Sequence, residues 1–233
     1  MADGARSKKR RGKGPRSSAD SRVVAPRGPG RKAPRETPFE LALGAVGRFL
    51  ETLAEPSAVI GGVAVIAWGR ARNTTDIDAA VSATPETAQA LIKRARAFDL
   101  EPRVPNAAAF AQESMVLLLQ HTPTSIPVDL SFAQLEFERR ALEAAVVRQF
   151  GSVSIRVPTA NALIVYKMVA SRPKDLEDVD DLLLRGLEID SKQILATLRS
   201  FDELLDTDRA GDFGSVLARI RKDRPAASPK SKR

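Results

Sequence analysis

The chain has 233 residues, of which 43% are hydrophobic, and it carries a formal net charge of +8. This length allows one large domain or two small ones with a substantial core. The absence of cysteine excludes disulfides, thiolate metal sites and cysteine nucleophiles. No long apolar run occurs, and no apolar stretch follows the basic start as in a signal peptide, so we expect a cytoplasmic protein without a membrane span.

The positive charge is concentrated at the two ends of the chain. Residues 1–36 contain twelve Lys and Arg against three acids, and residues 222–233 contain five against one, so residues 37–221 have a net charge of −5. The first segment has almost no large apolar residue, and we expect both ends to be disordered basic tails. Such tails attract RNA, DNA or acidic surfaces through a salt-screened term, but a solubilising extension explains them equally.

Short strands and helices are predicted to alternate over residues 37–157. Apolar residues at helical spacing predict a helix from Pro38, and a strand at 57–60, a short helix at 63–68 and a strand at 76–81 follow. Thr84 and Pro85 are typical of a helix start and predict a helix over 85–98. The remaining elements are strands at 115–120 and 128–132, a helix at 134–149 and a strand at 152–157. The turn at 121–127 contains the single histidine, His121, for which we expect a surface or turn role.

Residues 158–221 are predicted to be entirely helical. Thr159 is a candidate N-cap for a helix that runs to residue 170. Beyond Pro173, helices are expected at 174–184, 191–201 and 213–220. A small mixed sheet flanked by helices and followed by a helical C-terminal half is an α+β fold. We therefore divide the chain into a mixed domain at 37–157 and a helical region at 158–221, between the two tails.

Three acidic residues carry the strongest chemical signal. Asp76 and Asp78 are two apart on a predicted strand, so both side chains leave the same face while Ile77 points to the core. Asp129 lies in a second, otherwise apolar strand, and the three carboxylates converge if the two strands are neighbours. Because such carboxylates repel one another, they require a cation, and Mg²⁺ or Mn²⁺ suits oxygen ligands.

Converging carboxylates of this kind support two-metal phosphoryl chemistry. Asp129 would bind metal and act as the base for an incoming hydroxyl. By itself, an Asp-x-Asp pair is also explained as a turn or capping element.

A pair of glycines, Gly61 and Gly62, connects the strand at 57–60 to the next helix. Glycines let the backbone approach a phosphate closely, and N–H groups at a helix start attract anions. A simple tight turn accounts for the pair as well. The order of glycine turn, helix and strand with Asp-x-Asp is much less common than either motif alone.

Three segments together resemble the signature of minimal nucleotidyltransferases of the DNA polymerase beta superfamily. They are Ile60-Gly61-Gly62-Val63-Ala64-Val65, Gly69-Arg70, and Arg72-Asn73-Thr74-Thr75-Asp76-Ile77-Asp78. This superfamily includes antibiotic nucleotidyltransferases and the AbiEii-type toxins of toxin–antitoxin pairs, and the resemblance covers residues 40–185.

The resemblance implies transfer of a nucleoside monophosphate from an NTP such as ATP, with Mg²⁺. Asp76 and Asp78 would bind both metals, and Asp129 would complete the triad. Gly61, Gly62, Arg70 and Thr75 would contact the nucleotide. Many members have Ser at the position of Gly62, whereas other branches, including the AbiEii type, have Gly there.

A second cluster, in residues 167–178, resembles the Lys-x-x-Ala-x-Arg-x-Lys-Asp-x-x-Asp segment of the abortive-infection nucleotidyltransferases. The likeness implies that Lys167, Arg172 and Lys174 contact the triphosphate. Asp175 and Asp178, three apart on one helical face, would orient these cations or the acceptor. The alternative is a helix start with Ser171 as N-cap and acids in the first turn that complement the helix dipole.

The sequence therefore favours a Mg²⁺-dependent nucleotidyltransferase acting on a hydroxyl of RNA, protein or a small molecule. The basic tails favour RNA, and the toxin resemblance suggests an antitoxin or regulator as a partner. A non-catalytic nucleotide- or RNA-binding module on the same fold is the alternative. Retention of three acids favours catalysis, because a binding module does not need three converging negative charges.

Overall fold

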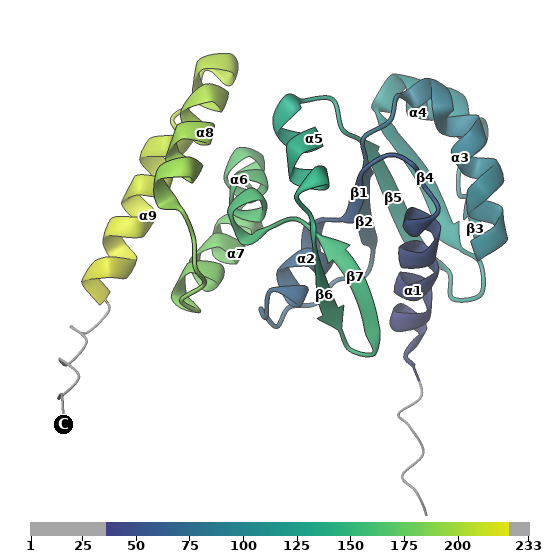
Figure 1. The fold of residues 1–233 in the computed structure, drawn as a ribbon, viewed down its shortest axis with the longest axis horizontal. Helices are drawn as coiled ribbons and strands as arrows, with labels where there is room; N and C mark the ends of the chain where they lie inside the picture. The colour runs from purple at the N-terminus through teal and green to yellow at the C-terminus, as the bar shows by residue number, and fades with distance from the viewer. Residues whose placement is uncertain (1–35, 224–233) are drawn as a thin grey trace, which may run out of the picture. The chain divides into compact units, whose positions relative to one another are not determined.

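The computed structural model describes residues 36–223, which form an α+β structure (Figure 1). The predicted tail at 1–36 lies outside the described residues except for residue 36, and the tail at 222–233 lies outside them except for residues 222 and 223. Within the described part, no helix is long and apolar enough to cross a membrane. The fold consists of a five-stranded mixed sheet, a two-stranded hairpin and a helical C-terminal part. The predicted α+β class, with a mixed sheet flanked by helices and a helical C-terminal half, is confirmed.

The central sheet has the strand order β1-β2-β5-β4-β3. Its strands are β1 (Ser57–Val59), β2 (Ile77–Val81), β3 (Leu100–Pro102), β4 (Val116–His121) and β5 (Ile126–Phe132). β2 and β5 are parallel neighbours, whereas every other pair in the sheet is antiparallel. The two strands predicted to carry the acids are therefore adjacent.

The two faces of the sheet differ in burial. Along β4 and β5, buried residues alternate with half-exposed ones, as expected for a sheet with one face in the core. The buried residues of these strands include Leu117, Leu119, Val128 and Leu130. They join the main core together with helix α1 (Pro38–Glu51), whereas the side chains of β4 and β5 on the opposite face are half-exposed.

The segment predicted as one helix over 85–98 consists of three pieces. A 3₁₀ turn at Pro85–Thr87 leads into α3 (Ala88–Ala95), and a second 3₁₀ turn at Arg96–Phe98 ends it. Asp99 then adopts a left-handed conformation with φ 58°. Two short elements that the sequence analysis did not identify follow, β3 and α4 (Ala107–Ser114).

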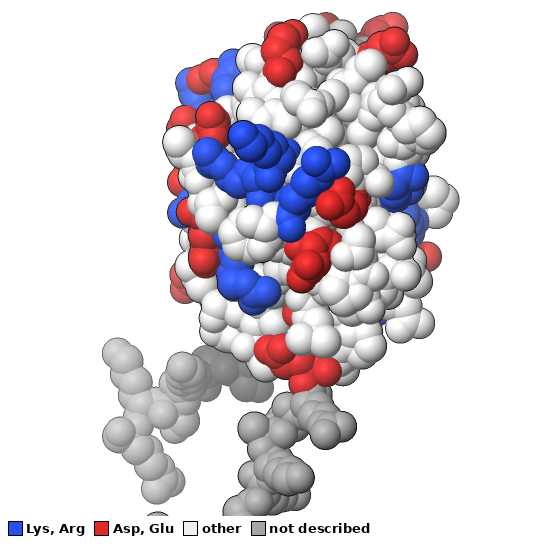
Figure 2. All heavy atoms as spheres, turned by 90° about the vertical axis from the view of Figure 1, so that its right-hand side faces the viewer, with Lys and Arg blue, Asp and Glu red and all other residues white. Residues whose placement is uncertain are grey.

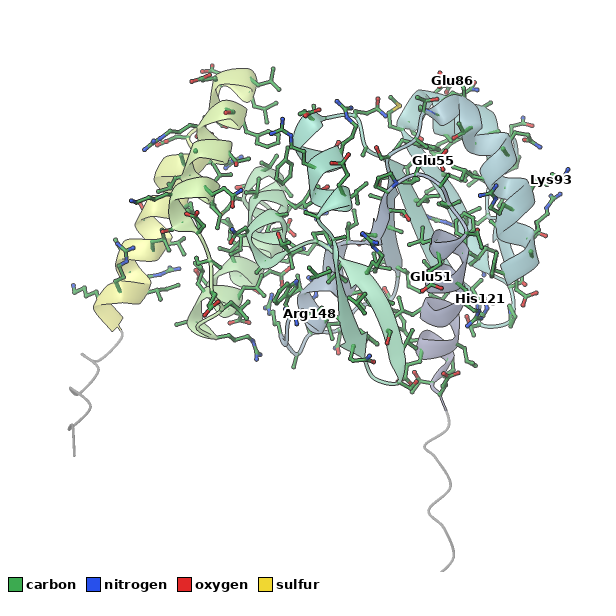
Figure 3. The ribbon with its side chains drawn as sticks, viewed as in Figure 1. Glu51, Glu55, Glu86, Lys93, His121 and Arg148 are labelled. Carbon is green, nitrogen blue, oxygen red and sulfur yellow. The ribbon has the colours of Figure 1, made fainter. Side chains whose placement is uncertain are left out.

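The helix predicted over 134–149 is wrong in its second half. α5 covers only Glu136–Glu143, and Val146–Phe150 forms strand β6, which pairs with β7 (Val153–Val157). The apolar periodicity continued across the boundary, but two consecutive β-branched residues and a turn at Gly151, with φ 54°, favour a hairpin. Arg148 lies on β6 (Figure 3). Its guanidinium lies 3.9 Å from the ring centroid of Trp68.

The C-terminal part is helical, as predicted. Its helices are α6 (Ala160–Ala170), α7 (Pro173–Leu184), α8 (Ser191–Leu205) and α9 (Arg209–Asp223). The Thr159 hydroxyl accepts a hydrogen bond from the backbone N–H of Ala162 and caps α6. Ser171 ends α6 in a left-handed conformation and Arg172 is the N-cap of α7, so the alternative with Ser171 as the N-cap is wrong.

His121 ends β4 and is 5% exposed, so of the expected surface or turn role the surface position is wrong and the turn role agrees with its contacts. Its Nδ1 lies 2.8 Å from the Thr124 hydroxyl, and its carbonyl accepts hydrogen bonds from the next turn. Burial lowers its pKa. Its role is therefore to stabilise the β4–β5 turn from inside.

Candidate active site

The three predicted acids lie on the accessible face where β2 and β5 meet. Asp78 and Asp129 are directly opposite each other in the parallel register. Asp76 immediately precedes β2, two residues before Asp78, and is exposed. Asp78 is half-buried, and the Asp129 side chain is 31% exposed. The strand pairing thus brings the carboxylates together from two segments that are distant in the sequence.

The electrostatics of this cluster are unfavourable for Asp78. Burial raises the pKa of its carboxyl, and the negative charges of Asp76 and Asp129 raise it further. Lys167 and Lys174 act in the opposite direction. A cation bound beside Asp78 would offset this repulsion and favour the charged form of its carboxyl.

Side-chain partners keep the three carboxylates from forming a closed cage. The Asp76 carboxylate accepts a hydrogen bond from the Thr74 hydroxyl at 3.1 Å, and Arg103 forms an ion pair with Asp129. Within residues 36–223, no three His, Cys, Asp or Glu side chains are close enough together to hold a metal ion as they stand. The backbone register suits a shared cation, whereas the Asp129 side chain is paired with an arginine.

Gly61 packs directly against the acids. Its φ of 62° belongs to the left-handed region that favours glycine, and a Cβ at this position would overlap the Asp78 carboxylate. A Cβ at Gly62 would lie 2.9 Å from the Thr74 hydroxyl oxygen. A serine at position 62 would therefore displace Thr74, which explains why glycine suits this chain.

A cavity of about 260 Å³ opens between the glycine turn and the start of α7. Acids and cations share its wall. The lining residues are Ile60, Gly61, Gly62, Arg72, Thr74, Asp76, Asp78, Tyr166, Lys167, Ala170, Arg172, Lys174 and Asp175. Eight of the twelve predicted site residues are among them, and the other four, Arg70, Thr75, Asp129 and Asp178, are not. The cavity therefore brings together the glycines, two of the three acids and the cations of the second cluster.

Lys167 is buried between two aspartates of α7. Its Nζ lies 2.9 Å from Oδ1 of Asp175 and 2.9 Å from Oδ2 of Asp178, and both aspartates are fully buried. Arg172 also binds Asp175, with 2.5 Å between Nε and Oδ2. Lys174 makes no ion pair with residues 36–223, so its ammonium is available at the cavity.

Arg70 and Arg72 connect the loop before β2 to α7. Arg72 lies 2.7 Å from Asp178, and Arg70 pairs with Asp178 and, at 2.6 Å, with Asp181. The structure therefore places Arg70 against α7 rather than at the cavity, where Arg72 is found instead. Arg70 and Arg72 are two residues apart in the same loop, so the sequence did not indicate which of them lines the cavity.

Sequence reasoning also missed Thr74, Tyr166 and Arg103. Thr74 stood inside the recognised motif, so its position beside Gly62 could have been anticipated. Arg103 had no local signal, because its contact with Asp129 spans 26 residues and depends on the order of the strands. The aromatic ring of Tyr166 packs edge-on against Phe137, with ring centroids 5.1 Å apart.

Comparisons with known proteins place the chain in a family. A family model described as "Nucleotidyl transferase AbiEii toxin, Type IV TA system" matches residues 47–228, and no curated protein matches the chain. Among solved structures, the chain is similar to an antigenic nucleotidyltransferase-like protein from Paracoccidioides brasiliensis, with 14% identity, a TM-score of 0.48, and coverage of 76% of this chain and 91% of the other.

JHP933 from Helicobacter pylori is also similar, with 15% identity, a TM-score of 0.45, and coverage of 79% of this chain and 90% of the other. The family model is the stronger finding, because it spans both the acidic motif and the second cluster. The chain therefore belongs to the AbiEii nucleotidyltransferase toxin family and is a nucleotidyltransferase.

Proposed function

We propose that the protein transfers a nucleoside monophosphate from an NTP to a hydroxyl of an acceptor, with Mg²⁺ or Mn²⁺. The observation that carries the proposal is the parallel register of Asp78 and Asp129 beside a cavity lined by glycines and cations. Asp76, Asp78 and Asp129 supply only oxygen donors, which suits a hard divalent cation. The cation would activate the acceptor hydroxyl and neutralise charge on the phosphates.

The cavity suggests how the nucleotide binds. The triphosphate would lie against Gly61 and Gly62, where the missing side chains allow close approach. Lys174 and Arg172 would bind its oxygens from the start of α7. Thr75 would contact the nucleotide from the exposed loop before Asp76.

The buried charged side chains would orient other groups of the site rather than bind the nucleotide themselves. Asp175 and Asp178 fix Lys167 between them, and Asp178 also holds the arginines of the loop that leads to Asp76. In this proposal Arg70 steadies that loop rather than binding phosphate. The positive charge of Lys167 would attract the phosphates toward the part of the cavity next to Asp78.

The acceptor would approach from the side of Asp129, which does not line the cavity. Its hydroxyl oxygen would form a bond to the α-phosphorus while the bond from that phosphorus to the bridging oxygen breaks. Pyrophosphate leaves, and the hydroxyl proton passes to Asp129. Placing the leaving group and the acceptor on opposite sides of the acids agrees with in-line transfer.

A transfer assay tests the proposal. The protein is incubated with Mg²⁺, each α-labelled NTP and a panel of RNA, protein and small-molecule acceptors. Asp78→Asn is expected to reduce label transfer by at least about a hundredfold, since it removes a charged ligand. Asp212→Asn, on an exposed carboxylate of α9, is the matched control and should transfer normally.

The same assay separates catalysis from simple binding. Nucleotide binding without transfer to any acceptor, unchanged in Asp78→Asn, would indicate a non-catalytic module. The pairing of Asp129 with Arg103 favours this alternative.

The family description suggests a toxin with an antitoxin partner, and we propose this role for the chain. Induced expression should arrest growth of a bacterial host, and Asp78→Asn should abolish the arrest. Arrest of equal strength with Asp78→Asn would show that the toxicity does not depend on nucleotidyl transfer.

A further inference from the structure

An arginine from another part of the chain holds Asp129. Arg103, which follows β3, donates a hydrogen bond from Nη2 to Oδ1 of Asp129. The two side chains are 30% and 31% exposed, so water reaches both. Within residues 36–223, Asp129 has no second ion pair or side-chain hydrogen bond. Its carboxylate is therefore positioned by this one contact.

The contact follows from the layout of the sheet. Asp78, Asp129 and Leu118 lie in one row across β2, β5 and β4. The backbone N–H of Arg103 donates to the carbonyl of Leu118 at 3.1 Å, which continues the row by one strand. Arg103 thus starts two strands, or about 10 Å, from Asp129 and reaches it across Leu118. Its guanidinium lies on the same face of the sheet as the acids.

Arg103 competes for the atom that a metal would use. A guanidinium and a divalent cation both bind carboxylate oxygens, and they cannot share the same lone pairs. Glu101, the acid nearest in sequence, is already paired with Arg96 at 3.0 Å. We propose that Arg103 is a positioning residue that holds Asp129 beside Asp78 until a divalent cation binds, and then gives Asp129 up to the cation.

The inference rests on the proposed function, because it assumes that Asp129 is a metal ligand. The exposure of the pair makes the exchange feasible, since ion pairs open to water are weak. Loss of such an ion pair changes an equilibrium constant by at most about fivefold. Removing Arg103 should therefore strengthen cation binding by up to a similar factor.

Mn²⁺ binding to the full chain without nucleotide tests this, measured by calorimetry and by electron paramagnetic resonance. Arg103→Ala is expected to lower the Mn²⁺ dissociation constant by about twofold to fivefold. Arg103→Lys, which keeps a cation, should lie between Arg103→Ala and the unmodified protein. Arg96→Ala, the matched control on the neighbouring ion pair, should bind Mn²⁺ normally.

Loss of any positive charge near the acids also attracts Mn²⁺, and a double-mutant cycle separates this effect. If the Arg103 guanidinium and the cation exchange at Asp129, Arg103→Ala should not increase the Mn²⁺ affinity of a protein that already carries Asp129→Asn. The inference would be overturned if Arg103→Ala still increased Mn²⁺ affinity in that background, or if Arg96→Ala increased it equally. It would also be overturned if Arg103→Ala alone did not increase it. Circular dichroism confirms folding, and Arg103→Lys carries the test if Arg103→Ala does not fold.

The outcomes also distinguish the inference from the proposed function. Mn²⁺ binding that Asp78→Asn abolishes but Arg103→Ala leaves unchanged would overturn only the role of Arg103. Absence of Mn²⁺ binding in every form, with or without nucleotide, would overturn both.

Discussion

Gly61 shows how a single residue shapes the site. It combines a left-handed backbone with direct packing against the Asp78 carboxylate. Gly61→Ala should displace Asp78, lower the unfolding free energy by about 1–2 kcal/mol and nearly abolish transfer. The matched control is Gly214→Ala, where a Cβ meets no atom within 4 Å, and this change within α9 should raise stability by about 0.5–1 kcal/mol. Denaturant unfolding and the transfer assay report both effects, and normal transfer by Gly61→Ala would contradict this role.

Asp175 makes the stability of the folded protein depend on pH in the acidic range. Burial alone would raise its pKa, but hydrogen bonds from Arg172 and Lys167 outweigh burial and hold the pKa below its ordinary value. Its contribution to stability is therefore complete above the unfolded pKa, about 3.9, and is lost as pH falls toward the lower folded pKa.

Asp175→Asn should consequently lower the unfolding free energy at pH 7 by about 3 kcal/mol, because it leaves buried Lys167 without one of its carboxylates. It should also reduce the loss of stability below about pH 4. Glu177→Gln, on a side chain of the same helix that is 70% exposed, is the control and should change neither quantity. Identical acid profiles for Asp175→Asn and the unmodified protein would contradict this account.

At the scale of elements, the junction of α6 and α7 carries the second cluster. Ser171 ends α6 with φ 50°, a conformation that costs energy for any residue except glycine. Ser171→Gly should therefore raise stability by up to about 1 kcal/mol. Ser200→Gly, within α8, should lower it by about 0.5 kcal/mol, so thermal unfolding should give opposite signs. Destabilisation by both changes would show that the Ser171 hydroxyl matters more than its backbone.

The elements with strong local signals could be predicted from the sequence. Thr159 marked the start of α6, and the break at Pro173 separated α6 from α7. The hairpin at Val146–Val157 was partly misread because its first strand continues the apolar spacing of α5, and only pairing with β7 decides its structure. β3 has three residues, too few for a periodic pattern.

The same distinction holds for the site: residues with a local sequence signal could be predicted, and contacts between distant segments could not. Asp76 and Asp78 share one segment, so a period of two was enough to place them on one face. The pairing of Asp129 with Asp78 depends on strand order, which local patterns do not encode. The contacts of Arg70 with α7 and of Arg103 with Asp129 join distant segments and follow only from the tertiary fold.

At the scale of the whole molecule, the larger of the two hydrophobic clusters in residues 36–223 includes residues from both the mixed part and the C-terminal helices. It includes Phe49 of α1, Ile77 of β2, Met168 of α6 and Phe213 of α9. We therefore predict a single unfolding transition, with Trp68 fluorescence and far-ultraviolet circular dichroism changing together. Two separate transitions would mean that residues 37–157 and 158–221 fold as independent domains.

Charge at the surface is mixed on the side that carries α3 and β3. Figure 2 shows Lys and Arg side chains gathered in the middle of this face with acidic side chains around them. Basic residues in the last turn of α3 are Lys93 and Arg94. This face therefore does not present a uniform basic field, which agrees with the negative net charge of residues 37–221.

The fate of two labels on one NTP tests the central claim most directly. The protein is given an acceptor, Mg²⁺ and an NTP labelled at either the α- or the γ-phosphate. Nucleotidyl transfer predicts that the α-label appears on the acceptor while the γ-label is released in pyrophosphate, and that Asp78→Asn stops both. Appearance of the γ-label on the acceptor, or transfer that Asp78→Asn leaves intact, would contradict the proposed reaction and the role of the three acids.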